Sequence, residues 1–136
     1  MIYLLDVNSL LALGILQHEF HERVAVWVAR LAKKGIPQLA TCSITELGFV
    51  RVVSQAQQDR ISVVQARELL LRWKASESIR CTFISDGQDI SHLPKWVKTP
   101  KQTTDGHLLQ LARANGAQLA MLDGNIPGSF LIPSSR

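Results

Sequence analysis

Four acidic residues stand at points in the sequence where a fold could bring their side chains together. Asp6 and Asp123 each follow a short apolar run that is typical of a strand buried on both faces. Asp105 falls in the first turn of a predicted helix, and Glu46 lies about one turn into another. Ligands of open parallel sheets bind outside the carboxyl ends of the strands. We therefore expect these four carboxylates to converge at one edge of a sheet.

Such a cluster has a definite chemical consequence. Carboxylates a few ångströms apart raise one another's pKa unless a cation compensates their charge. Mg²⁺ or Mn²⁺ suits this role, because hard divalent cations prefer oxygen ligands. A cation held in this way acidifies a water molecule and polarises a phosphate, so the predicted reaction is phosphodiester hydrolysis. Any one of these acids alone is more simply a turn residue or a helix cap. Their joint placement, in a chain with only 11 Asp and Glu residues, favours a shared site.

The elements that must position these acids follow from the apolar pattern. Strands are predicted at 2–5, 38–41, 80–84 and 118–122, with a final edge strand at 129–132. Helices are predicted after residue 8, over 19–34, around Glu46 to Val53, and over 63–74 and 105–114. Residues 85–101 resemble a loop with at most a short helix. This alternation predicts an α/β fold with three α/β/α layers, a mainly parallel sheet of four to five strands, and one domain over residues 1–136.

Composition points to an acidic partner. The chain has 15 Lys and Arg against 11 Asp and Glu, a net charge of +4, which favours nucleic acid over a membrane surface. No apolar run approaches the ~18 residues that span a bilayer. Asp6 interrupts the only N-terminal apolar run, so no signal peptide is expected. We expect a cytoplasmic protein whose two cysteines, Cys42 and Cys81, are reduced core residues.

Four segments of the chain, taken in order, resemble a PIN domain, and more narrowly the VapC-type toxins of bacterial toxin–antitoxin pairs. They are residues 3–8, 41–49, 104–109 and 119–123, and the resemblance covers nearly the whole chain. Each fragment alone is weak, but four in the right order at suitable separations are specific. One departure is Met121, where some relatives carry a hydroxyl residue two positions before the last acid.

The resemblance implies an Mg²⁺- or Mn²⁺-dependent endoribonuclease that cuts a tRNA or ribosomal RNA. Its catalytic acids would be Asp6, Glu46, Asp105 and Asp123. Asp6, Asp105 and Asp123 would hold the metal, and Glu46 would hold a metal-associated water or act as general base. The resemblance further implies a homodimer, and a small antitoxin that neutralises the enzyme and also binds DNA.

Several polar residues are candidates for supporting roles. Asn8 matches a family position that orients the first carboxylate, and it could equally cap a helix. Thr104 is first a helix cap and only second a group near the metal. Arg51 could contact a phosphate or lie on the helix surface. His18 and His21, three residues apart, would share a helix face and either contact RNA or face solvent.

Two other kinds of protein fit parts of the pattern. A catalytically silent α/β module that binds RNA or protein would keep the acids only as caps. A phosphatase with an aspartyl nucleophile commonly has a second Asp two residues after the first, where this chain has Asn8. The sequence also lacks a Gly-rich phosphate loop, which argues against an enzyme acting on nucleoside triphosphates.

Overall fold

A five-stranded parallel sheet forms the centre of the fold in the computed structural model, which describes residues 1–56 and 60–135. The strand order is β3-β2-β1-β4-β5, and each pair of neighbours is parallel. The strands are β1 (Ile2–Leu5), β2 (Gln38–Cys42), β3 (Arg80–Ile84), β4 (Ala117–Met121) and β5 (Phe130–Leu131). The predicted parallel sheet is confirmed.

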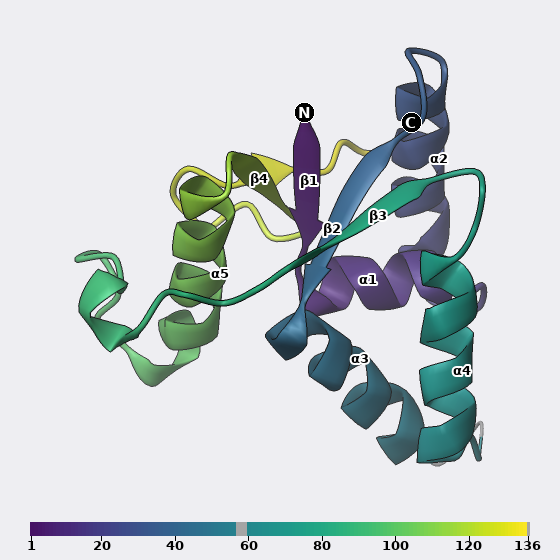
Figure 1. The fold of residues 1–136 in the computed structure, drawn as a ribbon, viewed down its shortest axis with the longest axis horizontal. Coiled ribbons are helices and arrows are strands. Elements are labelled where there is room, and N and C mark those ends of the chain that lie inside the picture. The colour runs from purple at the N-terminus through teal and green to yellow at the C-terminus, as the bar shows by residue number, and fades with distance from the viewer. Residues whose placement is uncertain (57–59, 136) are drawn as a thin grey trace.

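Helices cover both faces of this sheet (Figure 1). Four of them, α1 to α4, lie on one side, and α5 lies on the other with the long segment that follows β3. The helices are α1 (Val7–Gly14), α2 (His21–Ala32), α3 (Ser43–Gln55), α4 (Val63–Lys74) and α5 (Thr103–Ala114). Two 3₁₀ turns, η1 (Ile90–His92) and η2 (Pro100–Gln102), interrupt the segment between β3 and α5. The three-layer α/β/α architecture is therefore confirmed.

The two layers of core arise from the alternation of side chains along each strand. Leu5 and Leu39 face the core formed with α1 to α4, whereas Leu4 and Ala40 face the core shared with α5. All four are fully buried. A strand covered on both faces has no polar side to expose, so it reads as a continuous apolar run. This burial explains why β1, β2 and β4 were recognisable in the sequence, whereas β3 is mostly exposed.

The strand order creates a switch point beside the first strand. The chain runs from β1 outward to β2 and β3, and then returns to β4 on the opposite side of β1. The crevice between β1 and β4 is thus where the direction of winding reverses, the usual ligand site of an open α/β sheet. Asp6 follows β1 and Asp123 follows β4, so both lie at this crevice.

Most element boundaries agree with the sequence, and the differences have local causes. The predicted helix over 63–74 is confirmed, and its N-terminus is closed by a capping box between Ser62 and Gln65. The helix expected over 19–34 begins only at His21. His18 therefore lies in the preceding turn, where its Nδ1 accepts the Phe20 backbone N–H, and the expected shared helix face of His18 and His21 is wrong. No helix in the described ranges is long and apolar enough to cross a membrane.

Close contact between α1 and α3 depends on a glycine. A Cβ added to Gly48 would lie 2.6 Å from Val7 Cγ2, well inside van der Waals contact. Val7 is β-branched and sits in the first turn of α1, so its side chain has little freedom to move aside. Gly48 thereby lets α3, which carries Glu46, pack against α1, which follows Asp6.

We expect Gly48→Ala to lower the free energy of unfolding by about 1–2 kcal/mol, because the overpacking outweighs the better helix propensity of alanine. Chemical denaturation measures this loss. The double variant Val7→Ala, Gly48→Ala should recover most of it, since the clashing methyl groups are gone. Equal stability of Gly48→Ala and the wild type would show that the two helices do not need this close approach.

Candidate active site

Asp6 is the most buried of the predicted acids. It is only 5% exposed, and its backbone is the N-cap of α1. Its Oδ1 accepts the Ser9 backbone N–H at 2.9 Å, and Ser9 Oγ donates to the Ala120 carbonyl at 3.1 Å. The start of α1 is thus tied to β4 across the switch point. Burial raises the pKa of Asp6, the hydrogen bonds from Ser9 oppose this, and the charges of Asp105 and Asp123 raise it further.

Asp105 and Asp123 lie near enough to Asp6 for their charges to act on its pKa. Asp105 is half-buried in the first turn of α5, and its pKa is raised first by burial and then by the charge of Asp123. Asp123 follows β4 in an exposed turn, where its Oδ1 accepts the Asn125 backbone N–H at 2.9 Å. The charges of Asp105 and Asp123 thus act on Asp6, and that of Asp123 acts on Asp105.

These three side chains fit a hard divalent cation by their chemistry. They offer carboxylate oxygens, and the burial of Asp6 is unfavourable for a charged group without a compensating cation. Across the described residues, however, no three His, Cys, Asp or Glu side chains already lie close enough together to enclose one ion. The site is a converging set of acids rather than a closed coordination shell.

Glu46 has different partners from the three aspartates. Its Oε2 accepts hydrogen bonds from Thr41 Oγ1 at 2.5 Å and from Lys74 Nζ at 2.6 Å. Lys74 also lies over the Phe83 ring, 5.3 Å from the ring centroid. The negative charge of Glu46 is therefore balanced by a lysine from the end of α4, which the sequence did not indicate.

The supporting candidates lie in three different settings. Asn8 is exposed in α1 and lines the pocket beside Asp6, but the N-cap of that helix is Asp6, so the capping role considered for Asn8 is wrong. Thr104 is likewise inside α5, whose N-cap is Gln102, so its expected capping role is wrong. Thr104 and Arg51 are both exposed, the latter on α3.

A pocket of about 340 Å³ opens beside the switch point. Its lining combines two site acids with part of the turn between α1 and α2: Asp6, Asn8, His18, Glu19, Phe20, Leu122 and Asp123. Of the two histidine candidates, only His18 belongs to this lining. His21 Nδ1 instead lies 2.8 Å from the Ala12 carbonyl, an arrangement that anchors α2 to α1.

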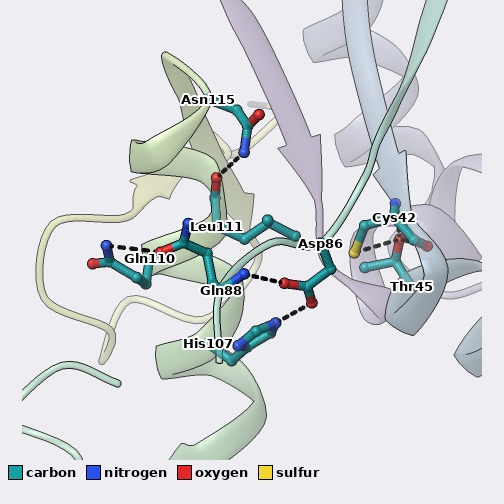
Figure 2. A network of polar contacts seen from close by, with 8 residues as sticks. All are labelled: Cys42, Thr45, Asp86, Gln88, His107, Gln110, Leu111 and Asn115. Atoms are coloured by element: carbon teal, nitrogen blue, oxygen red, sulfur yellow. Dashed lines mark hydrogen bonds and ion pairs between the residues drawn. The ribbon is translucent and has the colours of Figure 1, made fainter. Parts of the chain in front are cut away.

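Sequence reasoning missed a hydrogen-bonded pair near the start of α5. Figure 2 shows His107, on α5, bonded to the Asp86 carboxylate, which also accepts the Gln88 backbone N–H at 2.9 Å. Partial burial acts to raise the pKa of Asp86, but the hydrogen bonds from Gln88 and His107 and the His107 charge bring it below its ordinary value. Gln110 Nε2 reaches Gln88 Oε1 at 3.4 Å. These contacts fix the segment after β3 to the helix that carries Asp105.

The parallel α/β/α sheet with carboxylates at its switch point is the arrangement expected of a PIN-type domain. Comparisons with known proteins support this assignment. Over 133 residues the chain is 37% identical to ribonuclease VapC44 of Mycobacterium tuberculosis, covering 90% of this chain and 87% of the relative. It is 37% identical over 128 residues to ribonuclease VapC38 of the same organism, covering 90% of this chain and 86% of the relative. No protein-family profile matches the chain.

Solved structures give the same fold. VapBC2 from Rickettsia felis, bound to a DNA fragment from its promoter, superposes with a TM-score of 0.64 at 18% identity, covering 96% of this chain and 97% of the other. VapC20 of Mycobacterium tuberculosis, described as a toxin that cleaves the sarcin–ricin loop, superposes with a TM-score of 0.58 at 15% identity, covering 90% and 91%. The chain belongs to the VapC family of toxin ribonucleases. The endoribonuclease predicted from the sequence is thereby confirmed.

The electrostatics of Asp6 predict the behaviour of two substitutions in metal-free buffer. Asp6→Asn keeps an oxygen that can accept the Ser9 N–H and removes a repelled, buried charge, so its melting temperature should equal or exceed that of the wild type. Asp6→Ala loses the cap and should be about 1 kcal/mol less stable than Asp6→Asn. Thermal melts in excess chelator measure both. Marked destabilisation of Asp6→Asn would indicate that the carboxylate itself holds the fold together.

Proposed function

We propose that this ribonuclease depends on Mg²⁺ or Mn²⁺ and that Asp6, Asp105 and Asp123 hold the cation. The observation that supports the proposal is the placement of Asp6 and Asp123 after β1 and β4 at the switch point, with Asp6 buried and its pKa raised first by burial and then by the charges of Asp105 and Asp123. Dependence on a divalent cation is a general property of VapC nucleases. A cation bound there would neutralise charge on the scissile phosphate and acidify a water molecule.

The residues of the chain contribute position and charge to this reaction. Asp6 is fixed by the Ser9 N–H, so one of its oxygens has a set direction before substrate arrives. Asp105 and Asp123 bring two further negative charges from separate elements, which gives the site its attraction for a divalent cation. Asn8, on the pocket wall, can orient the first carboxylate or a water molecule through its amide. Thr104, next to Asp105, can contact a water molecule at the same site.

Glu46 is the proposed acceptor of a proton or the residue that holds the attacking water. Its Oε2 is occupied by Thr41 and Lys74, which leaves Oε1 as the oxygen for that role. Lys74 fixes the orientation of Glu46 and compensates its negative charge. The charges of the three aspartates stay available to bind the cation. Arg51 and His18 remain proposed RNA contacts, and His21 takes that role only if its bond to Ala12 opens.

Partners follow from the family and from the surface. We propose a tRNA or ribosomal RNA as substrate, and a small DNA-binding antitoxin as inhibitor, as in the DNA-bound VapBC2 complex. An apolar groove of about 450 Å³ beside Glu46 suits an antitoxin segment, since exposed Leu47, Leu71 and Phe83 contribute to its lining. An Arg or Lys of that segment could then reach the acids and pair with a carboxylate.

The nuclease prediction is tested with purified protein and single-stranded RNA. Cleavage should require Mg²⁺ or Mn²⁺ and stop in excess chelator. Asp6→Asn should reduce the cleavage rate on the order of 100-fold, because it removes a charge that stabilises the transition state through the cation. Gel analysis of labelled RNA gives both rates.

Asp89→Asn is the matched control, because it removes one negative charge from an exposed acid that caps η1, and asparagine can keep that cap. Its rate should equal that of the wild type. Undiminished cleavage in chelator, or equal rates in the Asp6 and Asp89 variants, would contradict the proposed metal site.

We also propose a homodimer, as expected from the family resemblance. Val52 and Val64 are exposed on α3 and α4 and stand outside the lining of the apolar groove, so they offer a separate surface for a second copy. Light scattering at micromolar concentration should give twice the chain mass of 15.1 kDa. A monomer mass at that concentration would exclude a stable dimer of the free protein.

A further inference from the structure

The turn between α1 and α2 forms one wall of the pocket that Asp6 and Asp123 line. His18, Glu19 and Phe20 from this turn line the same pocket as Asp6 and Asp123. The proposed metal site does not account for His18 or Phe20, which carry no carboxylate, and the Glu19 carboxylate is not among the charges that raise the pKa of Asp6 or Asp105. These turn residues are therefore available to contact another part of the substrate, beside the reacting phosphate.

Phe20 is both accessible and held in place. Phe20 is 40% exposed, and its backbone N–H donates to His18 Nδ1 at 3.0 Å. The His18 and Phe20 rings lie with centroids 5.9 Å apart and planes tilted by 44°, within the range of paired aromatic rings. The hydrogen bond and the ring contact thus restrict the conformations of Phe20 while its aromatic side chain stays exposed.

Most other aromatic side chains pack in the core, and the exposed Phe83 lines the separate groove beside Glu46. Tyr3, Trp27 and Phe130 contact one another with ring centroids 5.0 to 5.6 Å apart. Trp96, in the segment after β3, packs against the core on the α5 side, which argues against it as a platform for a base. Phe20 is therefore the aromatic residue placed at the acid pocket.

The charge of the wall indicates which part of a nucleic acid it would accept. The described residues that line the pocket include no Lys or Arg, whereas Glu19 and two aspartates are present. A phosphate would be repelled by Glu19, but the flat face of a base is uncharged and stacks well on an aromatic ring. We propose that Phe20, positioned by His18, forms a subsite that stacks an unpaired RNA base adjacent to the scissile phosphate.

This inference rests on the proposed RNA-cleaving role of the acids, and it adds a requirement for the substrate. Bases inside an RNA duplex are already stacked, and only bases in loops, bulges or single strands can turn onto a protein ring. The subsite therefore selects an unpaired nucleotide at the cleavage position. It reads no hydrogen-bonding edge, so it tolerates more than one base.

The test uses single-stranded RNA oligonucleotides carrying the fluorescent base 2-aminopurine at successive positions, in chelator so that no cleavage occurs. Stacking on Phe20 should quench the fluorescence at one position. Phe20→Ala should abolish the quenching and weaken binding about tenfold, within the range measured for loss of a stacked base. Phe20→Trp should restore both signals, whereas Phe20→Leu, which keeps an apolar side chain, should behave like Phe20→Ala.

Leu16→Ala is the matched control, because Leu16 is 74% exposed in the same turn and is not part of the pocket lining. It should bind RNA as the wild type does. Wild-type binding and quenching in Phe20→Leu would overturn the subsite, as would an effect of Phe20→Ala on affinity for the cognate antitoxin but not for RNA. Phe20-dependent quenching in a protein that cleaves no RNA with Mg²⁺ or Mn²⁺ would support the base site and count only against the proposed function.

Discussion

Asp6 is buried where burial and neighbouring charges disfavour its ionised form. Several contacts of the structure hold its side chain in that position. Burial and the two neighbouring aspartates all oppose its ionisation, while the hydrogen bonds from Ser9 favour it. Mutual repulsion of this kind makes a site avid for a compensating cation, because binding relieves a cost that the folded protein already bears. The sheet creates the conflict by ending β1 and β4 at the same edge, on either side of the switch point.

The supporting contacts can be understood as constraints on this edge. Ser9 bonds to the Ala120 carbonyl and so holds the start of α1 against β4. Gly48 allows α1 and α3 to pack closely. The bond between Asp86 and His107 fastens the segment after β3 to α5. Each contact joins elements that are distant in sequence and that carry or adjoin a proposed site residue. Several independent contacts therefore fix the positions of the acids.

The sequence predicted features whose cause is local or periodic. Buried strands appear as apolar runs, the helix over 63–74 shows both its period and its capping residues, and an acid directly after a strand must lie at the sheet edge. Two expected caps, at Asn8 and Thr104, were wrong because a neighbouring residue occupies the N-cap in each case. Sequence patterns rarely resolve helix ends to a single residue.

Contacts between distant segments could not be predicted in the same way. Lys74 ends α4 with a basic last turn, which is sufficiently explained by the helix dipole, and nothing in its spacing indicates that it pairs with Glu46, 28 residues earlier. His18 and Phe20 share the acid pocket only because the turn before α2 folds back toward β1 and β4. Phe20 can line the pocket because α2 begins only at His21. The predicted helix over 19–34 placed Phe20 inside a helix and so hid its position in the turn.

If the three aspartates repel one another until a divalent cation binds among them, the cation should stabilise the folded protein. The most direct measurement is the change in melting temperature on adding Mn²⁺, compared between the wild type and the double variant Asp6→Asn, Asp105→Asn. Mn²⁺ should raise the melting temperature of the wild type and leave that of the double variant unchanged. An equal rise in both proteins would contradict this prediction, because the cation would then bind elsewhere.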